Sequence, residues 1–248
     1  MNKSWKLISI TLVCYVVFML ILAPAAWWLK LVSLPAGVQL GNVSGTLSSG
    51  KVSGIQIQKL YLSDLSWQLN PWQLITGKAQ FAITSGNGQQ VQFPYVKSTL
   101  NYSLFGLSLQ DSLFRLQAVD VMPLLDMPVP IEVTGEVVLD IADYKQGEPV
   151  CDSLKGNVSW LDAKLLTLSG NWLDLQSLFA TLGCDDGSLV MQTAPDNILG
   201  LDAAFRFNSE RVQLDGTVQP ASSLPEEVHQ AMAVLGRPDG NGRYTLKL

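Results

Sequence analysis

The sequence predicts a mainly β protein, with a single N-terminal transmembrane helix followed by a bent, largely antiparallel β-sheet domain that carries one or two short helices. Three observations predict this class: a charge-free apolar run near the start, an alternation of period two beyond it, and turn-forming residues between the alternating segments. The chain has 248 residues, of which 48% are hydrophobic and 15% charged. Because disordered chains are poor in apolar residues, general disorder is excluded.

The first predicted element is the apolar helix over residues 7–29, which lies between Lys6 and Lys30 and contains no charged residue. At about 1.5 Å per residue, a helix of this length spans a hydrocarbon core of about 30 Å. Lys3 and Lys6 precede it, and Trp27 and Trp28 lie near its far end, where interfacial residues are expected. Since Lys and Arg mark the cytoplasmic side, residues 1–6 are predicted to be a cytoplasmic tail and residues 30–248 to lie across the membrane.

A cleaved signal peptide is the alternative for this segment. Ala23-Pro24-Ala25 resembles a small-residue cleavage site, and the preceding residues are basic. The apolar run is longer than the roughly 7–15 apolar residues of a signal peptide and continues past that site, which favours an uncleaved anchor. Under either interpretation the rest of the chain is exported.

The exported part shows the alternation of β-strands that have one buried and one wetter face. Turn-forming segments such as Asn70-Pro71 and Asp185-Asp186-Gly187 separate the alternating runs. Glycines recur inside the runs and predict a bent sheet. The clearest alternating sets are Leu65, Trp67 and Leu69; Phe81 and Ile83; Val137, Leu139 and Ile141; and Leu199, Leu201, Ala203, Phe205 and Phe207.

Two short helices are expected in this domain. Ser223 and Glu226 form a capping box, which predicts a helix that runs to Leu235 before Gly236. A weaker candidate covers residues 175–182. The proline-rich segment 120–130 is predicted to be a loop that divides the sheet into an earlier and a later part.

Three cysteines occur in the chain. Cys14 lies in the apolar run and is interpreted as a small hydrophobic residue. Cys151 and Cys184 are the pair outside it, and an exported domain permits a disulfide between them. A redox or nucleophilic cysteine needs a nearby base, and the single histidine, His229, is distant in the sequence, so structural pairing is favoured.

The composition points away from catalysis and from nucleic acid. The chain has 16 basic and 21 acidic residues, a net charge of −5, and no basic cluster to neutralise phosphates. One histidine and three cysteines leave little material for a zinc site, so no metal and no cofactor are expected. His229 is interpreted as a solvated helix residue, and Asp185-Asp186-Gly187 as a turn rather than a calcium loop. Scattered carboxylates such as Asp140 have no evident partner, which favours a non-enzymatic scaffold or binding protein.

Two segments resemble the signature of the type II secretion system protein N family. In that family a Val-x-Gly-Thr segment leads, after a strand, to a Trp-x-Leu-x-Pro-x-x-Leu-x-x-Gly segment. One departure is Ser49, where the family often has tryptophan before the glycine. The residues of this chain that occupy the two segments are Val43, Gly45, Gly50, Trp67, Leu69, Pro71, Leu74 and Gly77.

The resemblance implies a single-pass inner-membrane accessory component of the machine that exports folded exoproteins from the periplasm across the outer membrane. Its partners would be the other bitopic inner-membrane components of the C, L and M types, and exoprotein substrates are further candidates. The family has no assigned catalytic residue.

A second resemblance leads to a different function. The same Trp-x-Leu-x-Pro-x-x-Leu segment, with its glycine-punctuated strands, is similar to pieces of the AsmA-like envelope proteins, which implies a bent sheet that shields or transfers lipid along an apolar groove. An envelope hydrolase is a third, weaker alternative, because the usual catalytic motifs are missing.

Overall fold

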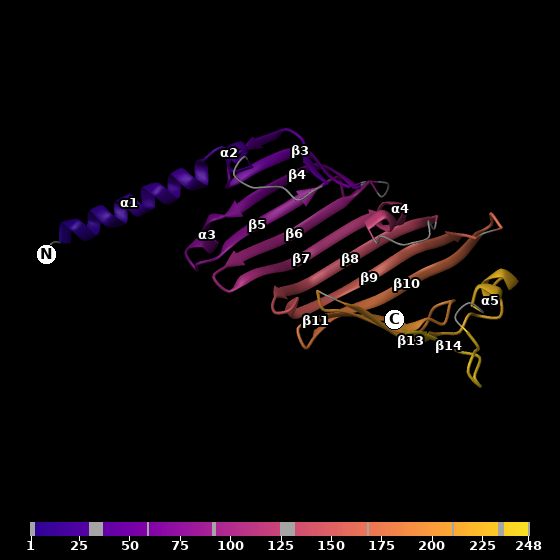
Figure 1. The fold of residues 1–248 in the computed structure, drawn as a ribbon. Helices are drawn as coiled ribbons and strands as arrows, with labels where there is room; N and C mark the ends of the chain where they lie inside the picture. The colour runs from indigo at the N-terminus through magenta and orange to yellow at the C-terminus, as the bar shows by residue number, and fades with distance from the viewer. Residues whose placement is uncertain are drawn as a thin grey trace.

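A computed structural model of the protein describes residues 3–29, 37–58, 60–90, 93–124, 132–167, 169–209, 211–232 and 236–247. All the strands of these ranges belong to one open, antiparallel sheet in which neighbours in sequence are neighbours in space, except that β1 and β2 both pair with β3 (Figure 1). The strands are β1 Val38–Leu40, β2 Val43–Gly45, β3 Ser49–Ile57, β4 Leu60–Asn70, β5 Ala79–Ser85, β6 Tyr95–Ser103, β7 Gly106–Gln117, β8 Val133–Gln146, β9 Cys151–Leu166, β10 Trp172–Asp185, β11 Ser188–Thr193, β12 Asp202–Phe207, β13 Val212–Val218 and β14 Tyr244–Lys247.

The described helices are few, and most are short. They are α1 Lys3–Leu22, α2 Ala25–Leu29, α3 Pro71–Leu74, α4 Ala118–Val121, the 3₁₀ turn η1 Met122–Leu124, and α5 Glu226–Met232. The apolar run 7–29 therefore forms two helices, which separate around Pro24, since proline breaks the helical hydrogen-bond ladder. Among the helices that the structure describes, none combines the length and the apolar character needed to cross a membrane.

Three expectations about local structure have clear outcomes. The helix expected at residues 175–182 is wrong, because these residues lie in β10. A helix is present in the expected region as α5, but it begins at Glu226 rather than directly after Ser223, and residues 233–235 of the expected range lie outside the described residues. Helices α4 and η1 occupy the start of segment 120–130, and residues 125–131 lie outside the described part. Strands β7 and β8 pair directly, so the sheet continues across this segment.

One face of the sheet is apolar from end to end. In the antiparallel register, residues directly opposite each other share a face. Apolar residues face one another across each pair of neighbouring strands in a continuous series. Examples are Trp67 with Ile83, Phe81 with Leu100, Leu100 with Leu109, Leu139 with Val158, Val158 with Ala180, and Met191 with Phe205.

The opposite face is polar and carries a ladder of amide side chains. Asn70 donates to Gln80 across 2.9 Å, Gln80 donates to Asn101 across 2.9 Å, and Asn101 donates to Gln110 across 3.2 Å. These bonds cross β4, β5, β6 and β7 in turn. Because a slip of one residue would move each amide to the other face, the ladder helps to fix the register of these strands.

Non-glycine residues with positive φ interrupt four of the strands. Asp64, Asp111, Asp162 and Gln176 have φ of 48°, 45°, 49° and 63°. Such a residue rotates the strand, so that apolar residues three positions apart, rather than two, lie on the same face. Packed clusters confirm that the apolar face survives the rotation: one joins Leu60 and Leu62 with Val96, Phe114 and Leu116, and another joins Trp160, Ala163, Leu165, Leu173, Leu175 and Leu178.

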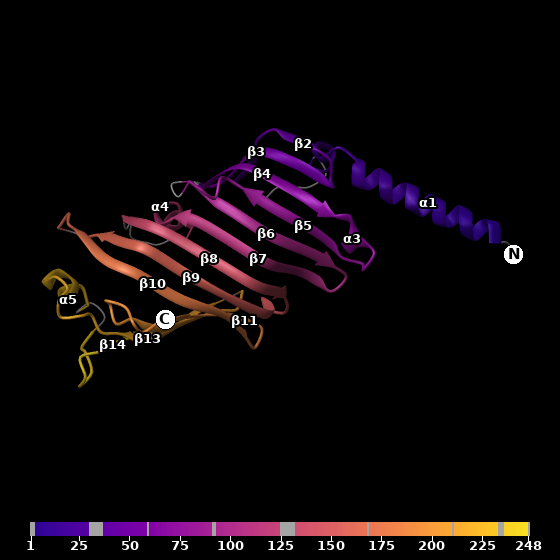
Figure 2. The same ribbon diagram turned by 180° about the vertical axis from the view of Figure 1, so that it is seen from behind.

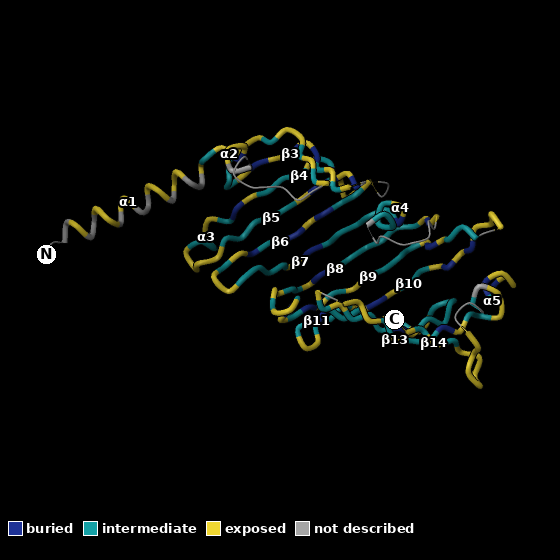
Figure 3. Tube along the Cα trace, viewed as in Figure 1, coloured by how far each residue is buried: buried dark blue, intermediate teal, exposed yellow. Residues whose placement is uncertain are grey.

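The sheet is curved, and its C-terminal strands turn under β9 and β10 (Figures 1 and 2). At this end Leu224 and Val228, from α5 and the residues before it, pack against Ala163 and Leu173 of the apolar face. Elsewhere most strand residues are only partly buried (Figure 3). The accessible surface is 16,617 Å², against about 11,000 Å² expected for a compact monomer of 27.0 kDa. The projecting helix α1 and the uncovered sheet account for the excess.

Candidate functional site

The residues of the two sequence segments meet at the N-terminal edge of the sheet. Val43 and Gly45 lie in β2, opposite Val52 and Gly50 of β3, and Gly50 in turn lies opposite Trp67 of β4. The Trp67 indole Nε1–H donates to the Leu47 carbonyl across 3.1 Å. The indole therefore holds the β2–β3 hairpin against β4, and we call this arrangement the clasp: β2, β3 and Trp67.

Glycine is required at two positions of the clasp. A Cβ at Gly50 would lie 2.3 Å from Cζ2 of Trp67 and 2.7 Å from the Ser44 carbonyl oxygen. Gly45 has φ of +95°, and a Cβ there would lie 2.4 Å from the Ser49 carbonyl oxygen. Real Cβ atoms do not approach backbone oxygens so closely, so a side chain at either position would push the hairpin away from the indole.

The clasp also holds the end of α1. The Leu47 N–H donates to the Ala23 carbonyl across 3.2 Å, and Pro24 forms an isolated β-bridge with Thr46. Helix α2 packs on β2, and Ala25 is buried there. The β2–β3 turn is thus bound on one side by Trp67 and on the other by the residues that follow α1.

The rest of the second segment builds the turn from β4 to β5. The Asn70 side chain accepts from the Trp72 N–H and caps α3, and Pro71 occupies the first turn of that helix, where a missing N–H has no cost. Leu74 ends α3, and Gly77 has φ of +75°. Leu69 is buried at the end of β4. This segment is therefore a strand, a capped helical turn and a left-handed glycine.

The residues expected at a membrane interface lie in the two N-terminal helices. Lys3 and Lys6 are in the first two turns of α1, and Trp27 and Trp28 are in α2. The Trp27 side chain is exposed. The two lysines and the two tryptophans are therefore in different helices, and their place at a membrane interface stays a prediction.

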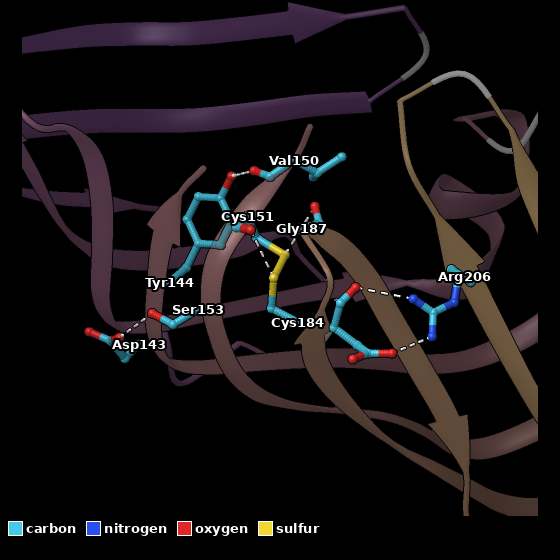
Figure 4. The surroundings of a disulfide bond; sticks show 9 residues. Asp143, Tyr144, Val150, Cys151, Ser153, Cys184, Gly187 and Arg206 are labelled. Atoms are coloured by element: carbon cyan, nitrogen blue, oxygen red, sulfur yellow. Dashed lines mark hydrogen bonds and ion pairs between the residues drawn. A yellow bond between two sulfur atoms is a disulfide. The ribbon is translucent and has the colours of Figure 1, made fainter. Parts of the chain in front are cut away.

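The disulfide is present in the structure. The Sγ atoms of Cys151 and Cys184 are bonded, which joins the start of β9 to the end of β10 (Figure 4). Around it, the N–H groups of Val150 and Cys151 donate to the Gly187 carbonyl across 3.0 and 3.1 Å. Arg206 of β12 forms an ion pair with Asp185, beside Cys184. The covalent bond and these contacts tie the β8–β9 and β10–β11 turns together.

The described residues contain no cluster of side chains that could hold a metal ion. Within these ranges no three His, Cys, Asp or Glu side chains converge as a metal site would require. His229 lies in α5 and is partly buried. The pKa of Asp239 is below its ordinary value because the backbone N–H groups of Arg243 and Asn241 donate to its carboxylate, and this group is in an exposed turn.

Four exposed apolar side chains, which the sequence analysis did not single out, lie in turns at one end of the sheet. Trp72 and Ile75 are in and directly after α3, and Leu104 and Phe105 form the tip of the β6–β7 hairpin. The signal was available in the sequence, because a tight turn normally has polar residues at its tip. We call these four side chains the apolar tips.

Comparison with known proteins identifies the family. The family model described as "Type II secretion system (T2SS), protein N" matches residues 36–247. The chain belongs to this family. Type II secretion system protein N of Aeromonas hydrophila is 31% identical over 255 residues, which cover 100% of this chain and 98% of that relative. The Vibrio cholerae serotype O1 relative is 29% identical, over 89% of this chain and 88% of its own length, and the Pectobacterium carotovorum relative is 27% identical, over 98% and 96%.

The family assignment agrees with the resemblance that the sequence segments suggested, and it makes the chain a member of a family of secretion-machinery components. No solved structure matches the chain. The clasp, the apolar face and the apolar tips are accordingly described from this chain alone.

Proposed function

We propose that the protein is an inner-membrane accessory component of the type II secretion system that supports the export of folded exoproteins from the periplasm across the outer membrane. The observation that carries the proposal is the family match over residues 36–247. In this proposal the protein acts through protein–protein contacts rather than by catalysis.

In this proposal residues 1–6 are cytoplasmic, the apolar run 7–29 provides the inner-membrane span through α1, and residues 30–248 lie in the periplasm. The last residues of the run, 23–29, pack on the sheet and so lie at the periplasmic surface of the membrane. The charge-free run and the lysines before it support this topology. The bond between Leu47 and Ala23 supports it as well, because the sheet then begins where α1 ends. The Cys151–Cys184 disulfide fits the oxidising periplasm.

The proposed partners are the bitopic inner-membrane components of the C, L and M types, together with exoprotein substrates. Strand β14 pairs with β13 on one side only, and an open edge of this kind can accept a strand from a partner through main-chain hydrogen bonds. A partner strand added there would extend the sheet beyond Tyr244–Lys247.

Deletion of the gene tests the proposal. Exoproteins should then accumulate, folded, in the periplasm, and the full chain supplied in trans should restore their export. Unchanged secretion in the deletion strain would refute the role. A reporter enzyme that is active only outside the cytoplasm, fused after Leu248, tests the topology separately and should be active.

A second function is favoured by one specific observation, the continuous and largely uncovered apolar face. Such a surface can shield the acyl chains of a lipid, as the second sequence resemblance implies. Benzoylphenylalanine at Leu139, on the apolar face, should then crosslink to phospholipid in cells. The same probe at Val138, its neighbour on the polar face, should not. Equal labelling at the two positions would argue against lipid binding by this face.

A further inference from the structure

The apolar tips are unusually exposed for their residue types. Leu104 and Phe105 are 100% and 97% exposed, and Trp72 and Ile75 are 77% and 79% exposed. Polar residues are sufficient to reverse the chain in a turn, so chain reversal does not explain apolar side chains at these tips. Clustered exposed apolar side chains on a folded protein usually mark a contact with another apolar phase or surface.

The two turns that carry the apolar tips lie on the side of the sheet from which α1 projects (Figures 1 and 2). In Figures 1 and 2, α3 and the β6–β7 hairpin end on the side from which α1 projects. The bond from Leu47 to Ala23 and the bridge from Thr46 to Pro24 fix the base of α1 to the sheet. The residues that follow α1 are therefore joined to the sheet at the end where the tips lie (Figure 1).

The charge of these two turns differs from that of the β8–β9 and β10–β11 turns at the same end of the sheet. Residues 70–78 contain no acidic residue and a single basic one, Lys78, and residues 102–107 contain no charged residue. The β8–β9 turn contains Glu148 and the β10–β11 turn contains Asp186, and both turns lie farther from α1 (Figure 1). Trp and other apolar side chains favour the interface of a bilayer, whereas carboxylates remain in water. This distribution of charge fits a bilayer surface that lies close to the apolar tips and farther from the acidic β8–β9 and β10–β11 turns.

We propose that the apolar tips insert into the headgroup and acyl boundary of the same bilayer that holds α1. This inference rests on the membrane attachment proposed above and adds a second point of contact. Two attachment points fix the tilt of the sheet over the membrane, whereas α1 alone would let the sheet swing. Four apolar side chains on two separate turns can each insert into a bilayer. A protein partner would instead require a contiguous apolar patch against which it could pack.

The test uses the full chain in lipid nanodiscs. Cys14 is the one cysteine outside the disulfide, so a Cys14→Ala background leaves no free thiol. Leu104→Cys in this background is labelled with a small environment-sensitive fluorophore. The matched control is Phe93→Cys, an exposed apolar residue in the β5–β6 turn at the opposite end of the sheet. Neither side chain is buried, so both variants should fold.

Brominated phosphatidylcholine should quench the Leu104 label by roughly half and leave the Phe93 label unchanged. Iodide in the aqueous phase should quench the Phe93 label more strongly than the Leu104 label. A Leu104 label that responds to iodide as strongly as the Phe93 label overturns the inference. A Leu104 label that is shielded in cells but exposed in nanodiscs also overturns it, in favour of a protein partner.

Carbonate extraction separates this inference from the proposed function. If the Leu104 label is exposed to water while the protein stays in the membrane pellet, the tips do not insert and the anchor stands. If carbonate releases the protein, the proposed anchorage fails, and the inference fails with it. As a second readout, a variant with Trp72→Ser, Ile75→Ser and Phe105→Ser should keep its melting temperature and lose lipid quenching at Leu104.

Discussion

The indole N–H of Trp67 donates to the carbonyl of Leu47 across 3.1 Å, and the N–H of the same Leu47 donates to the carbonyl of Ala23. One residue of the β2–β3 turn thus connects the sheet with the residues that follow α1. Trp67, in the second sequence segment, therefore has a structural role, because it positions the β2–β3 turn that binds the residues after α1.

Substitutions in the clasp should lower the stability of the protein. Trp67→Phe removes the donor to Leu47 and should cost about 1 kcal/mol. Gly50→Ala places a methyl group against the indole and the Ser44 carbonyl, and should cost about 1–3 kcal/mol. Thermal unfolding of the full chain in detergent, followed by circular dichroism, gives both values.

The matched control for Gly50→Ala is Gly183→Ala in β10. A Cβ at Gly183 would meet no atom within 4 Å. The free energy of unfolding of this variant should therefore lie within about 0.5 kcal/mol of that of the parent. Equal melting temperatures for the two alanine variants would show that Gly50 is not constrained by the indole.

Loss of the disulfide should destabilise the sheet. Cys151 and Cys184 are 33 positions apart, and closing a loop of this size contributes about 3–4 kcal/mol in the chain-entropy description. The Cys151→Ser and Cys184→Ser double variant should therefore melt at a lower temperature than the parent. Cys14→Ser is the control and should change little, and reductant should lower the melting temperature of the parent but not of the double variant.

The strand positions with positive φ, such as Asp162, should tolerate only residues that accept this backbone conformation. Asp162 has φ of +49°, and a β-branched residue is strained there, so Asp162→Val should cost about 1–2 kcal/mol, whereas Asp162→Gly should cost less. Asp140→Val in the extended part of β8 is the matched control, because it introduces the same side chain at an exposed position with ordinary strand geometry. Denaturant unfolding should show that the Asp162→Val variant is less stable than the Asp140→Val variant. The reverse order of stability would contradict backbone strain at position 162.

The order of the 239–243 turn should depend on pH. The N–H groups of Arg243 and Asn241 hold the pKa of Asp239 below its ordinary value of 3.8. The folded state therefore favours the ionised carboxylate, so its contribution is complete above the unfolded pKa and is lost as the pH falls through the lower folded pKa. Amide resonances of Asn241 and Arg243 should move in that acidic range. In an Asp239→Asn variant, whose side-chain oxygen accepts at any pH, they should not.

Alternation of apolar residues predicted the sheet, and it did so best where a strand is regular. Val137, Leu139 and Ile141 lie in β8 on the apolar face, as their spacing predicts. The strand expected over residues 199–207 is present from Asp202. The mistaken helix at 175–182 has a physical cause: Gln176 rotates β10, so Leu175, Leu178 and Leu182 follow one another at the spacing of three and four that is typical of a helix.

The sequence by itself determined the class of the domain, the turns between strands, the cysteine pair and the family segments, because each depends on residues close in the chain or on composition. Only the tertiary structure decided that the fourteen described strands form one sheet with a continuous apolar face and that the Trp67 indole bonds to Leu47. It also decided that α3 and the β6–β7 hairpin, which carry the apolar tips, lie on the side from which α1 projects (Figure 1). These relationships depend on register and on rotations such as that at Gln176. A rotation of this kind is decided by the pairing of a strand with its neighbours, and local sequence does not encode that pairing.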